Sequence, residues 1–233
     1  RLAEPEEIVS VGLQLLRSCG SLAGRSILIT AGPTYEDLDP VRYLGNRSTG
    51  RMGFAVAAEA IARGARVILI SGPTSLEPPA SVEIVQVRSA EQMHAAVLAR
   101  VDQADAVIMA AAVADYTPTA GPLTGKLHKE EGNLTVNLRR TPDILGELGR
   151  RRAGGAGPLL VGFAAETSDV VERAQQKLIA KQLDLVVAND VSQPDTGFAC
   201  DTNAASLVTA DGVEEVPLVT KRVLGAVILD RIE

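Results

Sequence analysis

The chain has 233 residues, enough for one large domain with a substantial hydrophobic core. Its net charge of −6 argues against general nucleic-acid binding, because that function needs a basic surface. No apolar stretch approaches the roughly 20 residues of a membrane span, and no signal-peptide pattern opens the sequence, so we expect a cytoplasmic protein that binds neither nucleic acid nor membrane. Cys19 and Cys200 are far apart, and His94 and His128 have no partners at ligand spacing, so neither a disulfide nor a zinc site is indicated.

The order of apolar and polar segments indicates the fold. Residues 1–25 form an acidic, then amphipathic lead-in that we interpret as a linker or short N-terminal helix, and residues 26–233 as one domain. Strands are expected at 26–30, 66–71, 106–111, 159–166 and 183–190. Helices are expected at 52–64, 91–101, 142–151 and 169–182. This alternation predicts an α/β fold: a Rossmann-like parallel sheet with helices on both faces.

Two segments break the alternation of strands and helices. Residues 134–140 alternate polar and apolar side chains like an exposed strand, and residues 206–218 have the pattern of a hairpin that turns at Asp211 and Gly212. We expect these segments to be additions at a sheet edge or arms for a partner subunit.

Ligands of open α/β sheets bind beyond the carboxyl ends of the strands, and this rule selects four loops. In the first, "NRSTGRMG" enters a helix whose N-terminus favours an anion, but Ser48 and Thr49, taken alone, are more typical of helix caps than of ligand contacts. In the second, Asp115 is either a magnesium or ribose ligand, or a cap or turn former.

The other two loops carry lysines. Lys126 and Lys129 lie between glycines, in a segment that either binds a ligand or is simply solvated. Beyond the fourth strand, Lys177 and Lys181 share one helix face, and Phe163 either stacks on a base or packs in the core. Together, the four loops favour one ligand site at the carboxyl edge of the sheet.

A series of motifs carries a family resemblance. The chain contains, in this order, "ITAGPTYEDLDPVRYLGNRSTGRMG", "AAVADY", "KLHK", "TPDIL", "VGFAAET", "QQKLIAK" and "LDLVVANDVSQPDTGF". From about Ser26 to the C-terminus, this combination closely resembles bacterial phosphopantothenoylcysteine synthetase, the ligase of coenzyme A biosynthesis. Such ligases are commonly the C-terminal half of a bifunctional protein whose N-terminal half is a flavin-dependent decarboxylase.

The resemblance implies a homodimer that uses CTP and Mg²⁺ to join 4'-phosphopantothenate to L-cysteine. The reaction passes through an acyl-cytidylate and releases pyrophosphate and CMP. The nucleotide set implied by the motifs is Asp115, Lys126, Pro142, Asp143, Ile144, Leu145, Phe163, Lys177 and Lys181, with Asp115 also a metal ligand. The acyl-substrate set is Arg42, Asn46 and Ala112, and the catalytic residues are Asn46 and Lys126. The loop that contains "KLHK", called the lysine loop below, departs from the family pattern, since His128 stands where another lysine is common.

Two alternative functions, from other classes of protein, are also associated with a sheet of this kind. A nicotinamide-dependent oxidoreductase is disfavoured, because the chain lacks GxGxxG and a suitably placed acidic residue at the end of the second strand. A non-catalytic nucleotide sensor would bind CTP without turnover.

Overall fold

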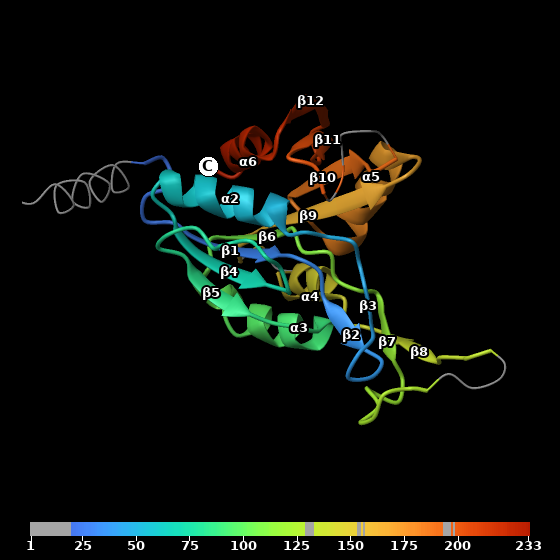
Figure 1. Ribbon diagram of the computed structural model, residues 1–233. Coiled ribbons are helices and arrows are strands. Elements are labelled where there is room, and N and C mark those ends of the chain that lie inside the picture. Colours follow the sequence, from blue (N-terminus) through green and yellow to red (C-terminus); the bar gives the residue numbers. More distant parts are fainter. Residues whose placement is uncertain (1–19, 129–132, 153–154, 156, 193–196, 198) are drawn as a thin grey trace, which may run out of the picture.

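A computed structural model describes residues 20–128, 133–152, 155, 157–192, 197 and 199–233 (Figure 1). The interpretation of residues 1–19 as a linker or helix, and the position of Lys129, lie outside these residues. The hydrophobic core reaches back to Leu22, which is buried just before the first strand.

The strands are β1 (Ser26–Ala31), β2 (Tyr35–Asp37), β3 (Tyr43–Gly45), β4 (Arg66–Ser71), β5 (Glu83–Gln86), β6 (Ala106–Met109), β7 (Tyr116–Pro118), β8 (Leu138–Arg140), β9 (Leu159–Glu166), β10 (Leu185–Asp190), β11 (Thr202–Val208) and β12 (Val213–Thr220). The helices are α2 (Arg51–Ala62), α3 (Ala90–Leu98), a 3-10 turn at Val101–Gln103, α4 (Ile144–Arg151), α5 (Val170–Lys181) and α6 (Lys221–Asp230).

The main sheet has the strand order β12-β11-β10-β9-β6-β1-β4-β5. The six strands from β10 to β5 are parallel, and they have the order of a doubly wound dinucleotide-binding fold, whose direction of winding reverses between β1 and β6. The expected Rossmann-like parallel sheet is therefore confirmed.

Helices cover both faces of the sheet (Figure 1). Because successive strand residues point to opposite faces, Ile27 and Ile29 of β1 pack in one core with α2 and α6, while Leu28 packs in the other. The second core includes the inward faces of α3, α4 and α5. The carboxyl ends of the parallel strands thus meet the N-termini of α2 and α4 at one edge.

The additional strands form an edge hairpin and two short ribbons. The hairpin of β11 and β12 turns over residues 209–212 at the sheet edge, which confirms the expectation for residues 206–218. Within residues 134–140, only β8 is a strand, and it pairs with β7 rather than with the main sheet. The β2-β3 and β7-β8 ribbons project together away from the main sheet, at the lower right of Figure 1.

Candidate functional site

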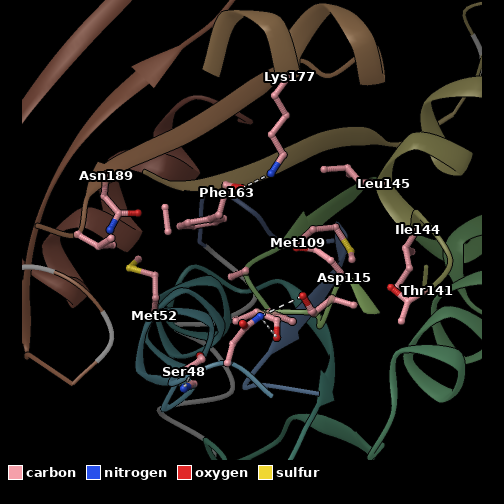
Figure 2. A pocket seen from close by; sticks show the side chains of 18 of the residues that line it. Ser48, Met52, Met109, Asp115, Thr141, Ile144, Leu145, Phe163, Lys177 and Asn189 are labelled. Atoms are coloured by element: carbon pink, nitrogen blue, oxygen red, sulfur yellow. Dashed lines mark hydrogen bonds between the residues drawn. The ribbon is translucent and has the colours of Figure 1, made fainter. Parts of the chain in front are cut away.

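A cavity of roughly 750 Å³ lies where the direction of sheet winding reverses. Its walls come from the carboxyl ends of β6, β9 and β10 and from the N-termini of α2 and α4 (Figure 2). Of the residues assigned by resemblance, the cavity is lined by Asn46, Ala112, Asp115, Pro142, Asp143, Ile144, Leu145, Phe163, Lys177 and Lys181. The structure therefore brings these residues together, although they come from separate parts of the chain.

Helix α5 contributes two lysines to one wall. Lys177 reaches from α5 toward β9, where Nζ donates a hydrogen bond to the Phe163 carbonyl at 2.5 Å (Figure 2). Burial lowers the pKa of Lys177, and the neighbouring charge of Lys181 lowers it further. The ring of Phe163 lines the cavity and also packs on the core, so base stacking and core packing are compatible. This wall is suited to a planar, anionic ligand.

Asp143 links α5 to the beginning of α4. As the N-cap of α4, it accepts a hydrogen bond from the Gly146 N–H at 3.0 Å through Oδ1, and the same oxygen lies 2.8 Å from Lys181 Nζ. Burial acts to raise the pKa of Asp143, but the bonds from Lys181 and Gly146 outweigh it, and the pKa is lowered. Asp143 is thus an ionised carboxylate that holds Lys181 at the cavity.

The loop after β6 is fixed by buried hydroxyl groups. Thr30 Oγ1 accepts a hydrogen bond from Ala111 N–H at 3.2 Å, and Thr34 Oγ1 accepts one from Ala114 N–H at 2.9 Å. The next residue, Asp115, is exposed at the cavity. It precedes β7 rather than a helix, so the helix-cap interpretation of Asp115 is wrong.

The side chain of Asn46 is hydrogen-bonded to the backbone of the same loop. Its Nδ2 donates to the carbonyls of Ala112 and Val113, at 3.2 and 3.1 Å. Both amide hydrogens of Asn46 are therefore committed to the backbone, and the side-chain oxygen Oδ1 is the remaining polar atom.

The N-terminus of α2 opens onto the cavity. The N-cap position falls on Gly50, not on Ser48 or Thr49 as the capping alternative required. Gly50 has a φ of 83°, a conformation that favours glycine, and Ser48 Oγ accepts the Gly50 N–H at 3.3 Å. The first N–H groups of α2 thus have no side-chain cap from their N-cap residue.

Several lining residues were not expected from the sequence, among them Met109, Arg140, Thr141, Asn189, Asn203 and Lys221. Asn189 ends β10, so the rule on strand ends would have found it. Lys221 begins α6 and is buried, and its Nζ donates to the carbonyls of Gly197, at 2.8 Å, and Cys200. Burial lowers the pKa of Lys221. No local sequence pattern predicts that this lysine reaches the cavity.

Arg42 and Lys126 are not among the cavity-lining residues. Arg42 lies in the β2-β3 turn, where its guanidinium binds Asp39, and Lys126 is exposed in the loop after β7. The described residues contain no cluster of three or more His, Cys, Asp or Glu side chains that could hold a metal. Within the same residues, no helix is long and apolar enough to cross a membrane.

Comparisons with known proteins identify relatives over nearly the whole chain. The family model described as "DNA/pantothenate metabolism flavoprotein C-terminal domain" matches residues 22–233. The coenzyme A biosynthesis bifunctional protein CoaBC of Bacillus subtilis (strain 168) is 47% identical over 225 residues, which cover 95% of this chain and 54% of the relative. Its namesake from Escherichia coli (strain K12) is 46% identical over 234 residues, 100% of this chain and 57% of the relative. The chain thus spans just over half the length of these relatives.

Solved structures agree with the fold. The crystal structure of the C-terminal domain of a coenzyme A biosynthesis bifunctional protein CoaBC superposes with a TM-score of 0.76 at 43% identity, covering 91% of this chain and 95% of that one. A Cab2 mutant in complex with phosphopantothenate-cysteine has a TM-score of 0.73, covering 97% of this chain and 90% of that one, but only 18% identity, so it supports the fold alone.

Proposed function

The chain belongs to the DNA/pantothenate metabolism flavoprotein C-terminal domain family, and on this premise we propose that it is the phosphopantothenate–cysteine ligase of coenzyme A biosynthesis. In this proposal CTP activates the carboxylate of 4'-phosphopantothenate as an acyl-cytidylate, and L-cysteine then displaces CMP. The observation that carries the proposal is the cavity, which gathers Asn46 and Ala112 with most of the nucleotide set.

The residues around the cavity suit this chemistry. A carboxylate does not acylate an amine at neutral pH until its oxygen becomes part of a good leaving group. When the carboxylate attacks the α-phosphate, negative charge builds up as pyrophosphate departs, and the cations Lys177 and Lys181, which line the cavity, would stabilise it. No protein nucleophile is required, and among the described residues that line the cavity there is no cysteine or histidine.

The donor atoms at the cavity fit a magnesium ion carried by the nucleotide. Mg²⁺ is usually bound by one or two carboxylates together with substrate phosphates, and Asp115 supplies an exposed carboxylate. The ion would neutralise charge on the triphosphate. Asp115 alone is therefore sufficient as the protein ligand, and a cluster of acidic residues is not needed.

We propose that Asn46 acts in the second half-reaction. Because both of its amide hydrogens bind backbone carbonyls, Oδ1 is the atom that can accept a hydrogen bond from the attacking amine of cysteine. Asn46→Ala is expected to slow CMP release more than pyrophosphate release. Equal slowing of both half-reactions would remove Asn46 from this role.

A single assay separates the ligase from its two rivals. We expect pyrophosphate release from CTP only when phosphopantothenate and Mg²⁺ are present, faster turnover with CTP than with ATP, and no reduction of NAD(P). CTP binding without pyrophosphate would indicate a sensor, and reduction of NAD(P) an oxidoreductase. Equal turnover with ATP would contradict the proposed preference for CTP.

Isotope labelling tests the route. If the carboxylate attacks the α-phosphate, ¹⁸O from its carboxylate stays with CMP when the amine attacks carbon. Attack on the γ-phosphate would instead give an acyl phosphate, CDP and labelled inorganic phosphate. Mass spectrometry of the products distinguishes the two routes, and we expect the label in CMP.

Lys126, in the loop after β7, also has a role in the proposed reaction. Although it does not line the cavity, we propose that it reaches the triphosphate in the transition state. Lys126→Gln is then expected to lower turnover about 100-fold, the scale of losing one electrophilic donor. Unchanged turnover would show that the lysine has no role in the chemistry.

The relatives' names suggest the wider context. Since they are called bifunctional, we propose that in the full-length protein this ligase is fused downstream of a flavin-dependent decarboxylase. We also propose that it works in the cytoplasm as a homodimer.

A further inference from the structure

Asp39 is a buried carboxylate that the proposed reaction does not use. It lies in the β2-β3 turn, 2% exposed, and both of its oxygens are hydrogen-bonded. Oδ1 accepts the N–H groups of Val41 and Arg42, at 2.8 and 2.7 Å. Oδ2 accepts Nε and Nη2 of Arg42, at 3.0 and 2.6 Å, and the Leu127 N–H at 3.0 Å.

The Leu127 backbone is held at both of its polar groups. While its N–H binds Asp39, its carbonyl accepts a second bond from Arg42 Nη2 at 2.7 Å. The same loop is joined to the same turn at another point, where the Leu123 N–H donates to the Leu38 carbonyl at 2.9 Å. The lysine loop is therefore anchored on the β2-β3 turn, next to Lys126.

The negative charge of Asp39 stabilises this contact between the lysine loop and the β2-β3 turn. Hydrogen bonds from the Arg42 guanidinium, and then those from the backbone, hold the pKa of Asp39 well below its usual range. A buried carboxylate with all its acceptor positions used is costly to disrupt, because any lost partner leaves unpaired charge.

We propose that Asp39 and Arg42 form a clamp on the Leu127 peptide that positions Lys126 for catalysis. Asp39 is then a positioning residue, which acts through the lysine loop and does not touch substrate. Arg42 likewise acts through the clamp, which differs from the substrate contact implied by resemblance. This inference rests on the proposed role of Lys126 in the ligase reaction.

Trypsin provides a readout that does not depend on activity. The bond it would cut, between Lys126 and Leu127, contains the N–H that Asp39 holds, so cleavage requires the clamp to open. Asp39→Asn is expected to speed cleavage at this bond at least about tenfold, measured by mass spectrometry of the peptides. A tenfold change corresponds to about 1.4 kcal/mol in the free energy of opening.

The activity measurements use a double-mutant cycle. Asp39→Asn is expected to lower kcat about tenfold or more, since small displacements of a catalytic group are costly. In a chain that already carries Lys126→Gln, adding Asp39→Asn is expected to lower kcat no further. An additive loss in the double variant would overturn the proposal, as would cleavage of Asp39→Asn at the wild-type rate.

Two further variants complete the test. Asp37→Asn is the matched control, because Asp37 is in β2 of the same ribbon but pairs with Arg88, and within the described residues it has no bond to the lysine loop. It is expected to keep both wild-type rates. If Asp39→Asn does not fold, Arg42→Lys replaces it, since it leaves a cation beside Asp39 but lacks the fork that reaches Leu127. Wild-type turnover of Lys126→Gln would refute the catalytic role of Lys126, whereas the cleavage rates would still report on the clamp.

Discussion

Asp143 combines two roles that can be separated by substitution. Its carboxylate caps α4 through Gly146 and binds Lys181 at the cavity. Asparagine caps a helix about as well as aspartate but carries no charge. Asp143→Asn is therefore expected to keep the cap and to lose the ion pair.

The pH dependence of stability identifies the lost charge. Because the folded pKa of Asp143 is lowered, its charge stabilises the fold above the usual pKa of about 3.9, and this contribution is lost as the pH falls through the folded pKa. We expect the wild type to have a higher Tm than Asp143→Asn at pH 7, and the difference to shrink as the pH falls below about 3.9 and to vanish below the lowered folded pKa, as measured by calorimetry. A difference that persists unchanged into acid would show that the charge is not its source.

The sequence predicts some cavity residues better than others, for physical reasons. Phe163 lies in the carboxyl-terminal half of β9 and Asp115 follows β6, so the rule on strand ends finds them. Lys221 reaches the cavity only because the hairpin of β11 and β12 returns the chain to it, and no local pattern specifies that packing. Arg42 belongs to a recognised motif, but its bonds to Asp39 and Leu127 depend on tertiary structure.

At the scale of elements, α2 lies very close to the sheet at Gly53. A Cβ at this position would lie 2.6 Å from Ala31 Cβ and 2.9 Å from the Thr30 carbonyl oxygen. Glycine is required there because the helix rests on β1, and this packing sets the N-terminus of α2 over the cavity.

Two glycine substitutions test this packing. Gly53→Ala is expected to lower the free energy of unfolding by about 1–3 kcal/mol, because overpacking outweighs the better helix propensity of alanine. Gly225→Ala in α6 is the control, since a Cβ there would meet α2 at an ordinary 3.4 Å. Urea denaturation is expected to show little change or a gain for Gly225→Ala. A similar loss in both variants would contradict the close approach at Gly53.

The strands and helices missing from the sequence prediction are short, or they lie next to a segment with a clearer hydrophobic pattern. Strand β5 follows a proline-rich loop, and none of its side chains is fully buried, so its apolar alternation is weak. The strands of the two ribbons are three residues long, below the length at which periodicity is informative. Helix α6 had a usable signal: Thr220 is its N-cap, and Leu224 and Ile228 are spaced for one buried face.

At the scale of the whole molecule, Leu22 is the first core residue in the part of the chain that the structure describes, and the family match begins at the same residue. Deletion of residues 1–19 is therefore expected to leave Tm and ligase activity unchanged. Leu22→Ala, by contrast, is expected to lower the free energy of unfolding by about 2–5 kcal/mol, the cost of truncating a buried leucine. Loss of folding on the deletion would mean that the segment belongs to the core.

The projecting ribbons are where we expect the interface of the proposed homodimer. Exposed apolar side chains gather on the two ribbons and the segments that flank them: Val41, Tyr43, Tyr116, Leu134 and Leu138. Such a group, on segments that pack little against the main sheet, is typical of an interface. It is unlike an isolated apolar residue such as Ile179, which is 77% exposed on α5.

Substitutions on the ribbons and on α5 test where the dimer interface lies. The wild type is expected to have twice the 24.4 kDa chain mass in light scattering after gel filtration. Leu134→Glu is expected to give the single mass, because a charge buried at the interface costs more than a small interface can recover. Ile179→Glu adds the same charge away from the ribbons and is expected to leave the dimer intact. A dimer that survives Leu134→Glu but not Ile179→Glu would place the interface on α5 instead.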